Sequence, residues 1–343
     1  MTERELTDRE NSVLQATVLD FVKSARPVGS RQISKKYEFD VSSATIRNTM
    51  ADLEEMGYLT HPHTSAGRLP TDKGYRYYVD MLMRYSEISP RDRDFILLQM
   101  DPNAQDIEEI LSKTSRLLGQ LSEELGIVLA PKLYSGILEK LQLVEIASDK
   151  MLVVIKIKSG IVKTVVLEIS HSVPKDHLDH ISTLLNERLA GLSLEEIKQT
   201  IDERFQSVEL RNDEIAQLLV QKSDSLFEFA DKVSIHVYGA KNIISQPELQ
   251  DPEKISSFME LMEHNEFLAD LFGDHAVNED ELVISIGSEN KHAEITDYSI
   301  VTSTYSFGNL RGQVAILGPT RMHYDKIASL VQLTANLMSE KLN

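Results

Sequence analysis

The sequence predicts an α+β protein that contains more than one domain. The chain has 343 residues, more than one hydrophobic core usually serves. Segments with helical apolar spacing fill the first 57 residues and the stretch 172–232, whereas strand-like runs gather before residue 170 and after residue 232. Because helices and strands form separate blocks, either two α+β domains or one domain with a helical insertion would fit.

The composition excludes several classes of protein. Hydrophobic residues make up 41% and charged residues 26%, values typical of a folded chain. No apolar run approaches the ~18 residues of a membrane span, and the polar start of the chain lacks the apolar core of a signal peptide. Cysteine is absent, which excludes disulfides, thiolate nucleophiles and cysteine zinc sites. We therefore expect a cytoplasmic protein with no membrane partner.

The net charge of −18 is unevenly distributed along the chain. Residues 1–85 hold twelve basic and twelve acidic residues, so the acidity lies entirely downstream. Within residues 23–47, six basic residues face two acidic ones, a local excess of four positive charges. A small cationic face on an acidic body is compatible with phosphate binding.

Three short helices are predicted at the N-terminus. The first begins at Thr7, which has the capping-box spacing to Glu10, and it ends before the Pro27-Val28-Gly29 turn. The second begins with Ser30 as its N-cap. The third begins at Ser42 or Ser43 and ends near Gly57.

A strand, a turn-rich loop and a second extended piece are predicted over residues 58–70. A helix rich in tyrosine follows from Thr71. Its tyrosines are interpreted as packing residues rather than as base-stacking residues; they are Tyr75, Tyr77, Tyr78 and Tyr85.

The rest of the chain shows one long helix at about 104–125 and then three strands, at 141–147, 151–157 and 161–169. Lys158-Ser159-Gly160 is a plausible hairpin turn between the last two strands. Helices are predicted again across 172–232, with a start at Pro174 and a cap at Ser193. Strands follow at 233–238, 282–286, 298–307 and 314–317, and a helix ends the chain.

Three helices followed by a two-stranded loop are the layout of a winged helix-turn-helix. The third helix would bury Ile46, Met50 and Leu53, which leaves its small and polar residues outward, as entry into a DNA major groove requires. Serines at its start could bind a phosphate. The candidate DNA-binding residues are Ser30, Arg31, Ser42, Ser43, Thr45, Arg47, Asn48, His63, Gly67 and Arg68. The alternatives are a ligand-sensing regulator, and a protein-interaction module that uses the same fold as a scaffold.

Several runs of residues resemble the heat-inducible transcription repressors of the HrcA family. The strongest are Val41–Leu59, across the third helix, and His63–Arg76, across the loop and the helix after it. Pro27–Ser30 also matches, and weaker similarity lies in Gly308–Gly312 and Ile316–Met322. The resemblance spans nearly the whole chain and is loosest at about 170–235.

The resemblance implies three domains. They are a winged-helix DNA-binding domain with its linker helix over 1–85, a GAF-like α/β domain over 100–171 plus 233–343, and an inserted helical dimerisation domain over 172–232. On this division the strands before 170 and after 232 form one sheet. The resemblance also implies a non-enzymatic repressor of chaperone operons, a dimer on an inverted-repeat operator called CIRCE, and activity that depends on a GroEL-type chaperonin.

Dimerisation is expected in the helical block, because its helices carry more apolar residues than one face needs. The candidate contacts are Leu178, Ile181, Leu185, Leu218, Leu219 and Phe229.

No cofactor, metal or catalytic site is predicted. His171, His177 and His180 lie near Asp176 and Asp179, but histidines at this spacing are more often part of a solvated helix surface than metal ligands. Gly308-x-x-x-Gly312 lacks the lysine and the spacing of a phosphate-binding loop, and no carboxylate pair stands out as acid and base.

Overall fold

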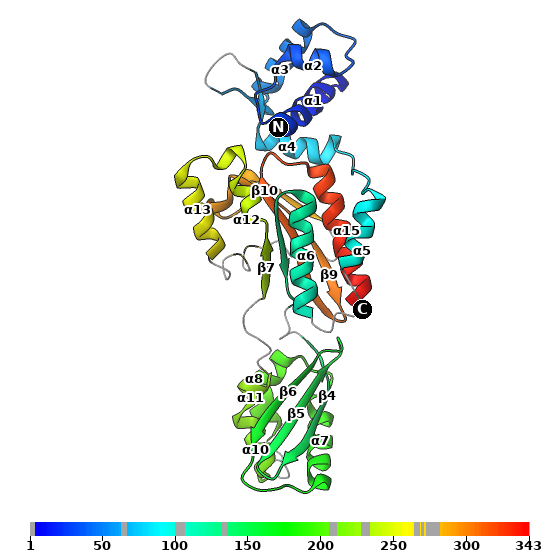
Figure 1. The fold of residues 1–343 in the computed structure, drawn as a ribbon, viewed down its shortest axis with the longest axis vertical. Coiled ribbons are helices and arrows are strands. Elements are labelled where there is room, and N and C mark those ends of the chain that lie inside the picture. Colours follow the sequence, from blue (N-terminus) through cyan, green and yellow to red (C-terminus); the bar gives the residue numbers. More distant parts are fainter. Residues whose placement is uncertain are drawn as a thin grey trace. The chain divides into compact units, whose positions relative to one another are not determined.

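The computed structural model of the chain describes residues 4–62, 67–99, 107–131, 136–205, 211–227, 234–263, 268, 271 and 282–342. It contains both helices and sheets, which confirms the α+β prediction. The chain forms two compact units (Figure 1). The first comprises Met1–Val128, Ile235–Thr304 and Gln313–Leu337; the second comprises Leu129–Ser234, Tyr305–Gly312 and Met338–Asn343.

The first unit begins with the order of elements that a winged helix requires. Three helices are followed by two short antiparallel strands in which Leu59 pairs with Pro70. These elements are α1 (Asp8–Ser24), α2 (Ser30–Lys36), α3 (Ser43–Glu55), β1 (Leu59–Thr60) and β2 (Leu69–Pro70).

The ends of these helices follow from local sequence. The capping box is present: the Thr7 side chain accepts from the Glu10 amide, and Glu10 accepts from the Thr7 amide. For α2 the prediction is wrong by one residue, because Gly29 is the N-cap and Ser30 is the first helical residue. The Pro27-Val28-Gly29 segment is already extended, so the helix begins directly after it.

The second strand of the wing is fixed to the turn between α1 and α2. The Val28 and Arg68 amides each donate to the other residue's carbonyl, both at 2.9 Å. Gly67 makes this close approach possible, since its φ is +132° and a Cβ would lie 2.8 Å from the Pro27 carbonyl carbon.

A linker helix leads from the wing to the rest of the first unit. It consists of α4 (Asp72–Tyr77) and a π-helical turn, η1 (Tyr78–Leu82). Tyr75 and Tyr78 are buried and Tyr77 contacts Asn11 and Tyr58, as the packing interpretation predicts, whereas Tyr85 is exposed.

A five-stranded sheet forms the core of the fold after the linker. Its strand order is β7-β3-β10-β9-β8. The strands are β3 (Leu125–Leu129), β7 (Ile235–Tyr238), β8 (Val283–Ile286), β9 (Tyr298–Phe307) and β10 (Leu310–Pro319). The four later strands are predicted from the sequence; β3 is not, and its first residue, Leu125, is assigned there to the preceding helix.

Helices surround this sheet. Helix α6 packs against β7 and ends at Ser122, where Glu123 takes a left-handed conformation. The predicted helices at about 104–125 and at the end of the chain are present as α6 and α15, and the other helices around this sheet were not predicted. The helices are α5 (Pro90–Gln99), α6 (Ile107–Ser122), α12 (Ala240–Ile244), η3 (Pro247–Leu249), α13 (Pro252–Glu263), η5 (Ala293–Ile295) and α15 (Tyr324–Leu342).

The second unit contains a separate three-stranded antiparallel sheet. Its strands are β4 (Leu138–Ala147), β5 (Lys150–Ile157) and β6 (Val162–Glu168), with the predicted hairpin turn at Lys158–Gly160. The expectation that these strands join the other sheet is wrong. Their inner face forms one core with four helices instead; these are α7 (Lys175–Leu189), α8 (Leu194–Arg204), α10 (Glu214–Gln221) and α11 (Ser223–Phe227).

Helix α7 also satisfies the backbone of the edge strand β4. The Asn186 side chain accepts from the Leu141 amide at 2.8 Å and donates to its carbonyl at 2.6 Å, and the Ser182 hydroxyl accepts from the Leu143 amide at 3.1 Å. These bonds protect an edge that could otherwise pair with another strand. The helical block and the strands before it are therefore one folded body.

The five-stranded sheet buries one unusual acid. Glu124 is 6% exposed, and its Oε2 atom has no hydrogen-bond partner among the described residues. Burial raises the pKa of Glu124 from 4.5 to about 8, against the opposing effect of the Arg321 charge.

We expect Glu124→Gln to stabilise the protein at neutral pH. The folded state keeps a proton that the unfolded state releases above pH 4.5, so stability falls as pH rises towards 8. The free energy of unfolding of the variant should exceed that of the wild type by up to about 3 kcal/mol at pH 7 and by little at pH 4. Urea unfolding across pH measures this. Exposed Glu123→Gln is the control, and a difference independent of pH would contradict the prediction.

We expect Gly67→Ala to loosen the wing. The added Cβ meets the backbone of Pro27 and Val28, so the opening free energy at the Val28 and Arg68 amides should fall by about 1–3 kcal/mol. Hydrogen exchange at these amides measures it. Gly160→Ala is the matched control, because Gly160 also has positive φ but open space around it. If Gly160→Ala lowered the opening free energy of its own turn as much as Gly67→Ala lowers that of the wing, the close backbone contact would be unimportant.

Candidate nucleic-acid interface

Helix α3 is fixed by a cap at one end and by apolar contacts along one face. The Ser42 hydroxyl accepts from the Thr45 amide at 3.2 Å and lies 3.0 Å from the Thr45 hydroxyl. Ile46, Met50 and Leu53 are buried. The cap uses the Ser42 hydroxyl, so a phosphate at this helix start would meet chiefly the backbone amides and Ser43.

The opposite face of α3 is open. Ala44, Arg47 and Asn48 are exposed, and Ser43 and Thr45 are partly exposed. Among the described residues, neither Arg47 nor Asn48 has a side-chain partner. A guanidinium and an amide that are free on a helix with small neighbours can reach base edges or phosphates without first breaking an internal bond.

Helix α2 contributes a smaller cationic surface. Arg31 is exposed and Ser30 is partly exposed at its start. A buried carboxylate, Asp20 of α1, accepts hydrogen bonds from Gln32 and Lys36 and so fixes α2 to α1. The bond to Asp20 also raises the pKa of Lys36. One of the six basic residues of segment 23–47 is therefore already paired within the protein.

The wing arginine, a candidate DNA contact, is held by an ion pair within the protein. The Arg68 guanidinium forms an ion pair with Glu54 at 2.7 Å, and its side chain is 26% exposed. Glu54 also contacts His61, so one acid of α3 organises both ends of the wing. His63, another candidate DNA contact, lies outside the described residues.

The predicted dimer contacts are mostly core residues of the second unit. Leu178, Ile181, Leu185 and Leu219 are at most 2% exposed, and Leu218 is partly buried against the same core. Phe229 lies outside the described residues. The surplus of apolar residues is explained by packing against β4–β6, so the argument for a dimer contact through these side chains is corrected.

Two of the three histidines of the second unit, His171 and His177, have acidic neighbours. His177 Nε2 lies 2.7 Å from an Asp213 oxygen, and His171 lies 4.0 Å from Glu214. Within the described part of the chain, no group of three or more histidine or acidic side chains could hold a metal ion. No described helix has the length and apolarity to cross a membrane.

Sequence reasoning missed the acids that organise the interface. Asp20 could have been found, because it falls on the buried stripe of α1 between Thr17 and apolar residues, where a charge requires a partner. Glu54 carries no comparable signal, since its partners come from the wing.

Comparisons with known proteins agree over the whole chain. The family model described as HrcA protein C terminal domain matches residues 108–328. A heat-inducible transcription repressor HrcA from Chlorobium phaeobacteroides (strain BS1) is 38% identical, with 99% of each chain covered. The protein of the same name from Chlorobaculum tepidum is 39% identical, with 100% of this chain and 99% of the relative covered.

One further relative and one solved structure extend the comparison. The HrcA of Pelotomaculum thermopropionicum is 38% identical over 98% of this chain and 97% of its own. The crystal structure of a hypothetical protein at 2.2 Å resolution has a TM-score of 0.64 and 24% identity, with 98% of this chain and 99% of that chain covered, and so shares the fold. By identity and coverage along its full length, this chain belongs to the family of heat-inducible transcription repressors, HrcA.

Proposed function

We propose that this repressor binds double-stranded operator DNA as a homodimer, with the exposed face of α3 from each protomer in a major groove. The observation that carries the proposal is the open face of α3, where Arg47 and Asn48 are exposed and have no internal partner among the described residues. An inverted-repeat operator, CIRCE in this family, suits a two-fold dimer because each half-site meets the same surface. The repressor would act in the cytoplasm, by binding and without catalysis.

The two alternatives make different predictions about that face. A scaffold for protein contacts would leave Arg47 without effect on DNA, and a ligand-sensing regulator would bind the operator only when a small molecule is present or absent. The domain after the linker, here proposed to be GAF-like, contains the five-stranded sheet to which such a ligand would have to couple.

We expect Arg47→Ala to weaken binding to the inverted repeat by about 1–3 kcal/mol and to reduce discrimination against mutated half-sites. Fluorescence anisotropy with intact and mutated duplexes at several salt concentrations measures both. The control is Arg84→Ala, which removes one exposed charge near the linker helix. Unchanged affinity in Arg47→Ala and Asn48→Ala would favour the scaffold reading.

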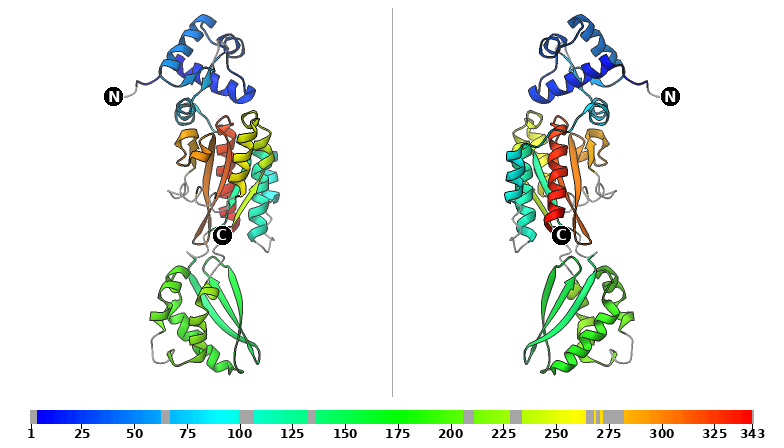
Figure 2. Two further views of the ribbon diagram at one scale, coloured as in Figure 1. Left: turned by 90° about the vertical axis from the view of Figure 1, so that its left-hand side faces the viewer. Right: turned by 90° about the vertical axis from the view of Figure 1, so that its right-hand side faces the viewer.

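The dimer contact is proposed to be the outer face of the sheet β4–β6. Among the described residues of this unit, helices cover the other face of this sheet and leave this one bare (Figure 2). On the bare face Val144, Ile146, Val162 and Val166 are 37–53% exposed, and Val144, Leu152 and Val166 stand opposite one another across the three strands. Apolar sheet faces of this kind are rare on monomers, and a second copy offers an equally flat, self-complementary surface.

We expect Val166→Lys to convert the dimer into a monomer, because each protomer would bring an unpaired lysine into the apolar contact. Sedimentation equilibrium measures the mass, and circular dichroism verifies folding. Gln199→Lys, on the exposed surface of α8, is the control and should remain dimeric. A stable Val166→Lys dimer would place the contact elsewhere.

We also propose that a GroEL-type chaperonin sustains the active repressor by recovering opened or dissociated chains. Dissociation would expose the apolar face of β4–β6, a surface that a chaperonin binds, and refolding would return the chain to the dimer. We expect the chaperonin with ATP to raise the fraction of active protein and to leave the dissociation constant of each active dimer unchanged. Titration of the repressor against excess operator measures the fraction. A tighter constant at unchanged active fraction would indicate direct co-repression instead.

A further inference from the structure

The linker helix α4 belongs to the same rigid body as the wing and α3. A Cβ on Gly74 would lie 2.1 Å from the Tyr58 carbonyl oxygen, so α4 lies directly against the backbone at the end of α3. The Thr71 hydroxyl donates to the Gly57 carbonyl at 2.7 Å, and the Tyr58 and Tyr77 rings pack edge to face at 5.3 Å. Any rotation of α4 therefore rotates the recognition helix with it.

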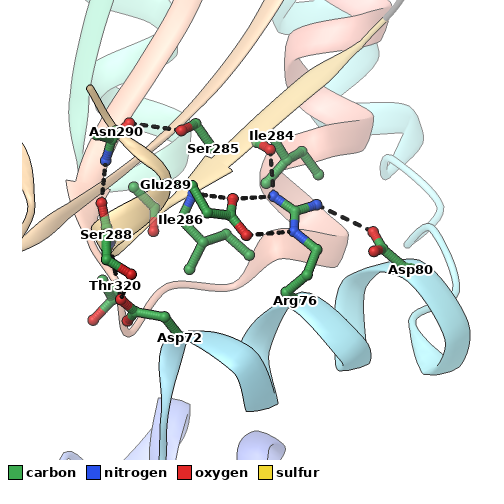
Figure 3. Close-up of polar contacts among 12 residues, drawn as sticks. Asp72, Arg76, Asp80, Ile284, Ser285, Ile286, Ser288, Glu289, Asn290 and Thr320 are labelled. Atoms are coloured by element: carbon green, nitrogen blue, oxygen red, sulfur yellow. Dashed lines mark hydrogen bonds and ion pairs between the residues drawn. The ribbon is translucent and has the colours of Figure 1, made fainter. Parts of the chain in front are cut away.

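The other side of α4 binds the end of strand β8 through polar contacts (Figure 3). Arg76 donates to both carboxylate oxygens of Glu289, at 2.8 and 2.5 Å, and to the Ile284 carbonyl at 2.6 Å. Asp72 accepts from the amide and the hydroxyl of Ser288, at 2.8 and 2.7 Å. We call this set the latch: Asp72 and Arg76 on α4, with Ile284, Ser288 and Glu289 opposite.

The segment that contacts α4, residues 284–290, includes the 3-10 turn η4 (Gly287–Glu289) and is held by internal hydrogen bonds. Buried Asn290 donates to the carbonyls of Gly287, Ile295 and Tyr298 at 2.8–3.1 Å and accepts from the Ser285 hydroxyl at 2.7 Å. Gly287 has φ of +52°, and a Cβ there would lie 2.5 Å from the Asp72 carboxylate. The loop thus presents its donors and acceptors to α4 in one arrangement.

A second polar anchor holds the far end of the same module. Arg321 donates to the Val22 carbonyl at 2.9 Å, in the last turn of α1, and is itself held by Glu248 at 2.6 Å and by Gln246 at 2.9 Å. Between the anchors, the Tyr75 and Tyr324 rings pack with centroids 5.8 Å apart. A ring contact alone would permit rotation about itself, whereas two directional anchors at separate points do not.

We propose that Asp72 and Arg76 are positioning residues for operator binding: the latch fixes the orientation of the recognition helix on the domain that follows it. This inference rests on the proposed binding of an inverted repeat by a dimer. In a dimer, the second winged helix binds with an effective concentration that depends on how narrowly its orientation is restricted. The side chains of Arg76 and Glu289 are 30% and 35% exposed, so the latch is a polar contact at the surface of the joint rather than part of an apolar core.

The test compares one half-site with the full inverted repeat. Arg76→Ala in the full-length protein should lower affinity for the full repeat at least tenfold and change affinity for a single half-site less than twofold. Arg76→Lys keeps the charge but loses the planar bidentate geometry, so its affinity for the full repeat should lie between those of the wild type and Arg76→Ala. Arg84→Ala is the matched control, and hydrogen exchange across α1–α3 verifies that the module remains folded.

The possible results distinguish failure of the proposed function from failure of the positioning role of the latch. If the wild type fails to bind the half-site and the full repeat, the proposed function is wrong. If the wild type binds both and Arg76→Ala keeps full affinity for the repeat, the latch does not position the helix. If Arg76→Ala weakens half-site and full-site binding equally, Arg76 acts on DNA contact or folding, and the positioning role is again wrong.

Discussion

The arrangement of the first unit depends on the close approach of α4 to the end of α3. Gly74 lies against the Tyr58 carbonyl at a distance that no side chain could tolerate. This contact joins the three helices, the two wing strands and the linker into one body, so every later contact of α4 is also a contact of the module that we propose binds DNA. A larger residue at position 74 would separate the wing from α4. The polar contacts of Asp72 and Arg76 would then no longer fix the orientation of α1–α3.

Basic residues of the first unit include some that are paired with an acid and some that have no acidic partner among the described residues. Lys36, Arg68, Arg76 and Arg321 each bind an acid, and each of these pairs joins two elements of the first unit. Arg31 and Arg47 have no such partner among the described residues. In an acidic protein this division matters, because a free cation next to surplus carboxylates would be drawn to them. Asp20 and Glu54 are already paired with Lys36 and Arg68, so these two acids compete less for Arg31 and Arg47.

Local signals explain what the sequence could predict. The capping box at Thr7 and Glu10, the cap at Ser42 and the hairpin at Gly160 are short-range features, and each is present. The outward direction of Arg47 and Asn48 follows from the apolar spacing of α3 alone. These features can be predicted from residues close to one another in the sequence, and the family resemblance indicates their function.

Long-range pairing explains what could not be predicted. The strands β4–β6 alternate in a way that suits any sheet, and only the helices packed on them show that they form their own. In the sequence, α7 and α10 therefore carry more apolar residues than one helix face needs. The structure buries these residues in the core of the second unit. Arg76 and Glu289 are 213 residues apart, and Arg68 meets Glu54 across the wing, so neither pair leaves a spacing signal.

The central claim, that the exposed face of α3 enters the operator groove, can be tested by tethered cleavage. The chain has no cysteine, so Asn48→Cys gives a unique site for an iron chelate that cuts nearby DNA. The account predicts two clusters of cuts related by the operator's symmetry, one in each half-site, and no such clusters when the cysteine-free wild type is treated with the same chelate. Absence of cleavage from position 48 on a duplex that remains bound, or cuts scattered without regard to the half-sites, would contradict it.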